Sequence, residues 1–135
     1  MDFADLTDDC CIESTENRVS LNDICALLKA DIICGSDKMD DYVCSACGCD
    51  LMSDVLAFTK PGSILLTGLT NSQVIRTAEI LDLKCIVFVR DKKPDSATIE
   101  MAKESGIPLL SSHYPLYESC GLLYKRGLRG CMNFE

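Results

Sequence analysis

Residues 65–71 read Leu65-Leu66-Thr67-Gly68-Leu69-Thr70-Asn71, and this run indicates both a fold class and a candidate site. An apolar segment that breaks at Gly68 and passes directly into a helical pattern is typical of a strand-to-helix turn in an α/β fold. Thr70 or Asn71 can cap the helix, because short polar side chains accept hydrogen bonds from its first N–H groups. Free backbone N–H groups at such a turn bind anions and small molecules. The run therefore predicts a ligand site, but it contains no catalytic group.

Helical and extended patterns alternate on both sides of this run. Periodicity predicts helices over 50–58, 71–81, 96–105 and 114–126, and strands over 63–67, 84–89 and 108–111. The 84–89 run is almost wholly apolar, as expected of a strand buried on both faces. Strands and helices that alternate in this way form right-handed crossovers and a parallel sheet. We expect an α/β fold, a single compact domain with a mainly parallel sheet flanked by helices.

The amino-terminal part is expected to hold a tail and further elements. Residues 1–18 are rich in Asp and Glu and lack apolar periodicity, which predicts an acidic tail before a domain over 19–135. Ser20 should cap a helix over 21–30. Two strands are predicted at 31–35 and 42–49, and neither needs to join the main sheet.

Composition excludes several functions. With 135 residues and 47% hydrophobic residues, the chain can bury one core of ordinary size. A formal net charge of -8 without a basic segment argues against a nucleic acid partner. The first residues are acidic where a signal peptide would be basic, and no apolar run is long enough to span a bilayer. We therefore expect a cytoplasmic protein without a membrane partner.

Ten cysteines in a chain without an export signal indicate a reducing compartment. We interpret most of them as free thiols. Cys25, Cys34, Cys85 and Cys120 lie in apolar stretches, which is typical of core packing.

The three strands expected from residue 63 onward end at one edge of the sheet, and each end carries hydrogen-bond donors. These are Thr67, Gly68, Thr70 and Asn71 after the first strand, Arg90 after the second, and Ser111, Ser112 and His113 after the third. Hydroxyls, a guanidinium and helix N-termini suit a phosphate or carboxylate group on a small ligand. The same residues could simply cap helices and end strands. His113 has no neighbouring Cys or Ser that would indicate a catalytic base.

Two further groups of residues could bind a ligand or a metal. Asp50, Ser53 and Asp54 place two carboxylates four residues apart on one helical face, suited to a hard cation, to acid–base chemistry, or to capping the helix. Cys44, Cys47 and Cys49 form a C-x-x-C-x-C cluster that could hold zinc or an iron–sulfur cluster. In one extended strand Cys44 would face away from the other two thiols, so binding by all three requires a turn at 45–46. The fourth ligand would have to be Cys34, Cys10 or Cys11.

The chain contains no G-x-x-x-x-G-K-[ST], G-x-G-x-x-G or G-x-S-x-G sequence, so the common enzyme motifs are missing. The ordered segments 21–35, 49–57, 65–70 and 87–90 instead resemble the DRTGG domain over roughly residues 19–128. They are also similar to the amino-terminal domain of HPr kinase/phosphorylase. After Thr67-Gly68 the chain reads Leu69-Thr70 and lacks the Asp and Arg of the family's eponymous segment.

The resemblance implies a compact α/β domain, found alone or beside catalytic and CBS domains, that commonly self-associates and has no established activity of its own. The kinase domain of HPr kinase has no counterpart here, so we expect no phosphotransfer. We interpret the chain as a non-catalytic regulatory or ligand-sensing domain, a homodimer without a cofactor, that binds an anionic metabolite or nucleotide or a protein partner. The alternative is a redox or metal module built on the cysteine cluster.

Overall fold

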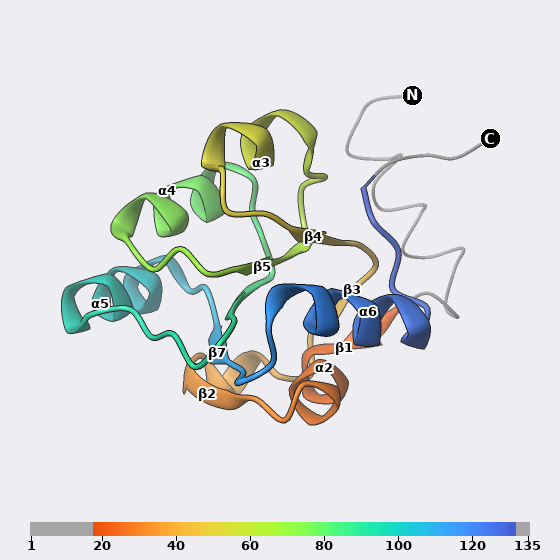
Figure 1. Ribbon diagram of the computed structural model, residues 1–135. Helices are drawn as coiled ribbons and strands as arrows, with labels where there is room; N and C mark the ends of the chain where they lie inside the picture. Colours follow the sequence, from red (N-terminus) through yellow and green to blue (C-terminus); the bar gives the residue numbers. More distant parts are fainter. Residues whose placement is uncertain (1–17, 132–135) are drawn as a thin grey trace.

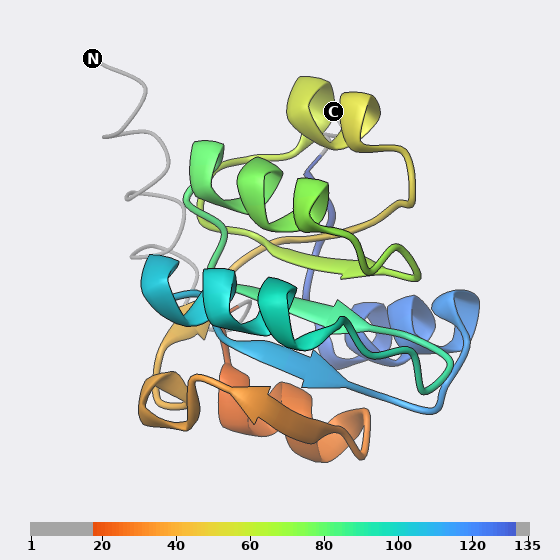
Figure 2. The same ribbon diagram turned by 90° about the vertical axis from the view of Figure 1, so that its left-hand side faces the viewer.

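A computed structural model describes residues 18–131 and has three layers (Figure 1). A central sheet lies between helices α3, α4 and α5 on one face and helices α2 and α6 on the other, as the turned view in Figure 2 shows. Within the described residues no helix is long and apolar enough to cross a membrane. The α/β fold with a mainly parallel sheet, expected from the alternating pattern, is confirmed.

The main sheet of the described residues has five strands in the order β2-β7-β6-β5-β4. Their bounds are β2 (Asp31–Cys34), β4 (Ala46–Gly48), β5 (Ile64–Thr67), β6 (Cys85–Phe88) and β7 (Leu109–Ser111). The four strands from β4 to β7 are parallel neighbours, whereas β2 pairs antiparallel with β7. The carboxyl ends of β4, β5, β6 and β7 consequently lie along one edge of the sheet, which we call the carboxyl edge.

The central strands are buried on both faces, which accounts for their unbroken apolar sequences. All eight residues of β5 and β6 are buried, and Leu65, Leu66 and Ile86 have no exposed surface. Alternate residues supply two separate cores, because successive side chains of a strand point to opposite faces. Leu65 and Phe88 pack under α3, α4 and α5, while Leu66 and Val87 pack under α2 and α6.

Capping residues mark the starts of α2, α4 and α5 and the ends of α5 and α6. The helices are α2 (Leu21–Leu27), α3 (Met52–Phe58), α4 (Ser72–Ile80), α5 (Ser96–Ser105) and α6 (Leu116–Arg126). Ser20 caps α2 by accepting from the Asp23 N–H at 3.1 Å. Gly106 and Gly127 end α5 and α6 in the left-handed conformation that glycine adopts without strain.

Two expectations about the amino-terminal half are wrong. The predicted strand over 42–49 is two strands, β3 (Tyr42–Val43) and β4, which belong to different sheets. β3 pairs with β1 (Val19–Ser20). The sequence left open whether the strands at 31–35 and 42–49 join the main sheet, and β2 and β4 both do. The helix predicted to start at residue 50 starts at Met52 with Leu51 as its N-cap, so Asp50 precedes it.

Two glycines are required by close contacts. Gly35 follows β2 with φ 85°, and a Cβ there would lie 2.6 Å from Pro108 Cα. Gly48 in β4 lies against Cys120 of α6, so a Cβ on Gly48 would overlap the Cys120 Sγ atom. The edge strand β4 and helix α6 therefore pack closely, because Gly48 has no side chain and the Cys120 thiol fills the space.

Replacing Gly48 by Ala should destabilise the protein by about 1–3 kcal/mol, because the new methyl group meets the Cys120 Sγ atom in a packed interface. In the Cys120→Ala background the same replacement should cost much less, since the obstructing atom is gone. Urea unfolding of the two single variants and the double variant measures this coupling. Costs that simply add would show that the two residues do not pack as described.

Candidate functional site

The carboxyl edge brings together most of the residues that the sequence pointed to. Register places Thr67 beside Phe88 and Phe88 beside Ser111, so the turns after β5, β6 and β7 are neighbours. Gly48 lies beside Leu66, which puts Asp50 at the same edge one strand further out. The predicted juxtaposition of the strand ends is therefore present in the fold.

Asp50 occupies the position expected for an external anion. Its Oδ1 atom accepts a hydrogen bond from the Gly68 N–H at 2.8 Å and another from the Thr67 hydroxyl at 2.9 Å. The Leu69 N–H in turn donates to the Thr67 hydroxyl oxygen at 3.1 Å. The Gly68 and Leu69 N–H groups, expected to be free, are thus satisfied within the chain. Asp50 and Asp54 also do not share a helical face, because Asp50 turns toward β5 before α3 begins.

The turn after β6 carries the strongest concentration of positive charge at this edge. We call residues 90–93, Arg90-Asp91-Lys92-Lys93, the β6 loop; all four are exposed. Within residues 18–131 the only ion pairs are Lys103–Glu100 and Arg126–Asp23, so none of the loop's cations is neutralised by an ion pair.

The backbone of the β6 loop is strained. Arg90 and Asp91 both have φ 59°, and they are the only adjacent non-glycine residues of positive φ in the described part of the chain. The left-handed conformation costs about 1–2 kcal/mol for an L-residue with a Cβ. Hydrogen bonds hold it: the Arg90 N–H donates to the Tyr114 carbonyl at 3.0 Å and the Asp91 N–H to the Ser112 carbonyl at 2.8 Å.

Lys92 is a further candidate residue at this edge, and it is not among those predicted from the sequence. A Cβ built on Gly68 would lie 3.8 Å from Lys92 Cδ and 3.7 Å from Asp50 Oδ1. The Lys92 side chain and the Asp50 carboxylate, which come from different turns, therefore both lie close to Gly68. The signal was present in the sequence, because four consecutive charged residues follow a buried strand.

Several predicted site residues also make contacts within the protein. The Ser111 hydroxyl donates to the Lys92 carbonyl at 3.1 Å, and the buried Ser112 hydroxyl donates to the Leu28 carbonyl at 2.7 Å. Asn71 is the N-cap of α4, where its side chain accepts from the Gln73 N–H at 3.1 Å. Thr70 is half-buried beside it, and Ser53 and Asp54 are exposed in the first turn of α3. His113 is exposed and stacks on Tyr114, with ring centroids 4.3 Å apart.

The cysteine cluster does not form a metal centre in the described residues. Cys44 lies between β3 and β4 and is disulfide-bonded, while Cys47 and Cys49 are half-buried free thiols. Burial raises the pKa of the Cys47 thiol above its usual value, which disfavours the thiolate that a metal needs. Within residues 18–131, no three His, Cys, Asp or Glu side chains are grouped so that they could hold a metal ion.

A fourth ligand from Cys34 is excluded by topology. Cys34 is in β2, at the opposite edge of the sheet from β4, and four strand spacings amount to roughly 19 Å. It is buried, and its thiol donates to the Ile107 carbonyl at 3.7 Å. Cys10 and Cys11 lie outside the described residues.

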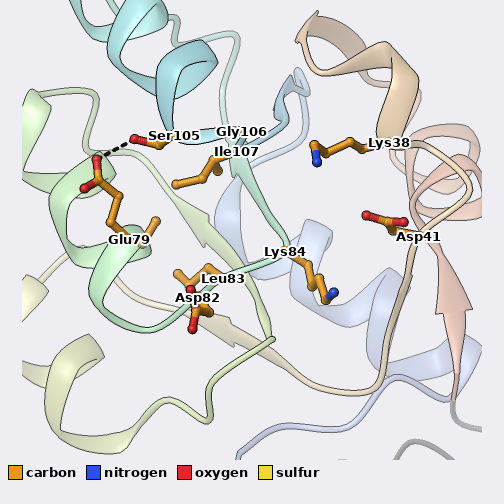
Figure 3. Close-up of a pocket in the computed structure, with 10 residues that line it drawn as sticks. Lys38, Asp41, Glu79, Asp82, Leu83, Lys84, Ser105, Gly106 and Ile107 are labelled. Carbon is orange, nitrogen blue, oxygen red and sulfur yellow. Dashed lines mark hydrogen bonds between the residues drawn. The ribbon is translucent and has the colours of Figure 1, made fainter.

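A hollow lies at the amino edge of the sheet, opposite the carboxyl edge (Figure 3). It has a volume of about 530 Å³ and contains none of the residues predicted from the sequence. Its charged lining consists of Lys38, Asp41, Glu79, Asp82 and Lys84. Carboxylates outnumber ammonium groups there, and the carbonyl ends of α4 and α5 add negative potential. This hollow is unsuited to an anion, whereas the carboxyl edge presents the cations.

Comparisons with known proteins agree with this fold. The family model described as the DRTGG domain matches residues 23–125. Among solved structures, the chain is similar to the CBS and DRTGG domains of the regulatory region of Clostridium perfringens pyrophosphatase, in complex with its activator diadenosine tetraphosphate. The TM-score is 0.64 at 15% identity, and the match covers 100% of this chain but 56% of that one. The likeness establishes the fold. No curated protein matches the chain.

Arg90→Gly should raise the free energy of unfolding by about 0.5–1 kcal/mol. Glycine removes the strain of a left-handed residue, and this gain exceeds the entropy that glycine adds to the unfolded chain. Arg76→Gly is the matched control, because the same exchange within helix α4 should lower stability by about 1 kcal/mol. Chemical unfolding measures both, and a destabilised Arg90→Gly variant would show that Arg90 is not strained.

Proposed function

This chain belongs to the DRTGG domain family, and from that premise we propose that it is a non-catalytic regulatory domain whose carboxyl edge senses an anionic small molecule. The ligand class is one that carries phosphate groups, such as a nucleotide. The structural relative's activator, diadenosine tetraphosphate, belongs to this class and serves as the first probe. The match covers 56% of that relative's chain. That this domain regulates an activity is therefore also part of the proposal.

The observation that carries the proposal is the strained β6 loop. Backbone strain of this kind clusters at ligand sites, and Arg90 and Asp91 are the one pair of adjacent left-handed residues other than glycine in the described part of the chain. Lys92 presents a charge without an ion-pair partner beside Gly68, in the turn after β5. Arg90 carries a second such charge two residues earlier in the same loop. A guanidinium and an ammonium group there supply the charge-assisted hydrogen bonds that phosphate oxygens accept.

Asp50 supplies a means of signalling. Its carboxylate already holds the Gly68 N–H and the Thr67 hydroxyl, so a phosphate that uses these donors must displace it. Asp50 lies between β4 and the start of α3, and its release would loosen the entry to that helix. Binding is thereby coupled to the position of α3, whose Leu51 and Phe58 side chains are exposed.

Self-association completes the proposal. Regulatory domains of this size transmit a ligand signal by changing how two copies, or a copy and its neighbouring domain, contact each other. A closed pair with two-fold symmetry is the simplest such assembly. We infer a homodimer whose interface is separate from the carboxyl edge.

Arg90→Ala should weaken binding of diadenosine tetraphosphate about ten- to a hundredfold, the effect of losing a hydrogen bond to a charged group, about 1.5–3 kcal/mol. Isothermal titration calorimetry at fixed ionic strength measures it, with ATP and inorganic pyrophosphate as further probes. Arg76→Ala is the control, because it removes the same charge from helix α4. Absence of binding by all three probes, or equal affinities for the Arg90→Ala variant and the wild type, would refute the site.

Asp50→Asn should strengthen binding of the same ligand about fivefold. The amide still accepts from Gly68 and Thr67 but no longer repels a phosphate, a difference of about 1 kcal/mol at contact distance in water. The gain should shrink at high salt, where exposed charges are screened. Asp54→Asn, an exposed carboxylate of α3, is the matched control. Weaker binding by Asp50→Asn would instead make Asp50 a ligand contact.

A further inference from the structure

Helix α6 exposes an unusual outward face. It packs Ser119 and Leu123 against the rest of the fold, and at 100° per residue the opposite side carries five residues. They are Tyr117, Glu118, Gly121, Tyr124 and Lys125. Tyr117 is 85% exposed and Tyr124 is 64% exposed, so two large rings seven residues apart lie in one line on the surface.

Gly121 lies between the two rings. A Cβ at this position would meet no atom within 4 Å, so no contact inside the protein requires glycine. Glycine within a helix costs about 1 kcal/mol relative to alanine. Its benefit is a flat place where another backbone can approach closely.

The two charges of this face have no ion-pair partners. Among the ion pairs of residues 18–131, Arg126 of α6 bonds Asp23 of α2 at 3.7 Å, whereas neither Glu118 nor Lys125 takes part in one. They are seven residues apart along the helix, roughly 10.5 Å, which is too far for them to pair with each other.

We propose that α6 pairs with α6 of a second copy of this chain, antiparallel about a two-fold axis at Gly121. This arrangement rests on the self-association proposed above and assigns its surface. Tyr117 of one copy lies on Tyr124 of the other, and Glu118 of one copy bonds Lys125 of the other, each contact occurring twice. The two glycines meet at the axis, where the helices come closest.

The pattern fits a second copy better than an unrelated partner. The tyrosines at 117 and 124 and the charges at 118 and 125 are each centred close to Gly121. A two-fold axis at Gly121 therefore places each residue of a pair opposite the other member of that pair in the second copy. A parallel pair would instead place the line of charges of each copy against the tyrosines of the other, which leaves Glu118 and Lys125 without ion-pair partners. The contact between two helices of 11 residues is smaller than a standard interface of about 1,600 Å², so the dimer is weak and reversible.

Sedimentation equilibrium between about 1 and 500 µM tests the pairing. The wild type should change from one chain of 14.8 kDa toward twice that mass as concentration rises. Glu118→Lys and Lys125→Glu should each weaken association at least tenfold, because like charges then face each other twice. The double variant should recover it to within about threefold.

Net charge gives a further control. Glu118→Lys makes the acidic chain less negative, so a general effect of charge repulsion would strengthen association instead. Glu100→Lys changes the charge equally on helix α5 and should leave association unchanged. Gly121→Gln should abolish the dimer while raising the melting temperature of the monomer, since glutamine favours the helix.

The outcomes separate the two proposals. A wild type that stays monomeric at every concentration overturns both self-association and the α6 interface. A wild-type dimer that is unaffected by the charge exchanges and by Gly121→Gln overturns the α6 interface alone. Neither result bears on ligand binding at the carboxyl edge.

Discussion

Parallel pairing of β5 with β6, buried on both faces, is the constraint from which the rest of the structure follows. Side chains that alternate between two cores require helices on both faces, and parallel strands require a crossover between each pair. Parallel pairing from β4 to β7 also places the turns that follow these four strands at one edge of the sheet. The carboxyl edge is therefore a consequence of burying β5 and β6, and its chemistry is set by the residues of four separate turns.

Opposite charges divide this edge. The Asp50 carboxylate closes the turn between β5 and α4 from within, while the β6 loop holds Arg90 and Lys92 without ion-pair partners. An acidic chain with net charge -8 repels anions at long range, so the proposed recognition of an anion would depend on these local donors. If a phosphate binds here as we propose, an internal carboxylate that competes with it would make binding modest but responsive, as a sensor requires.

The regular half of the fold could be predicted from the sequence, and the site only in part. Continuous apolar runs and capping residues such as Asn71 and Gly106 identify β5, β6, α4 and α5, because these signals are local. The split between β3 and β4 could not be predicted, since it depends on pairing with distant strands. The edge residues were found from strand order alone. The hydrogen bond from the Gly68 N–H to the Asp50 carboxylate could not be predicted, because it joins residues 18 positions apart in the sequence.

The most direct test of the account is to follow backbone amide NMR signals while diadenosine tetraphosphate is added to the protein. The account predicts shifts at Gly68, Thr70 and residues 90–93, with a distinct change at Gly68 as its N–H exchanges the Asp50 carboxylate for a phosphate oxygen. Signals around Lys38, Lys84 and Gly106, at the amino-edge hollow, should stay unchanged. Shifts confined to that hollow, with Gly68 and Arg90 unaffected, would contradict the assignment of the carboxyl edge as the sensing site.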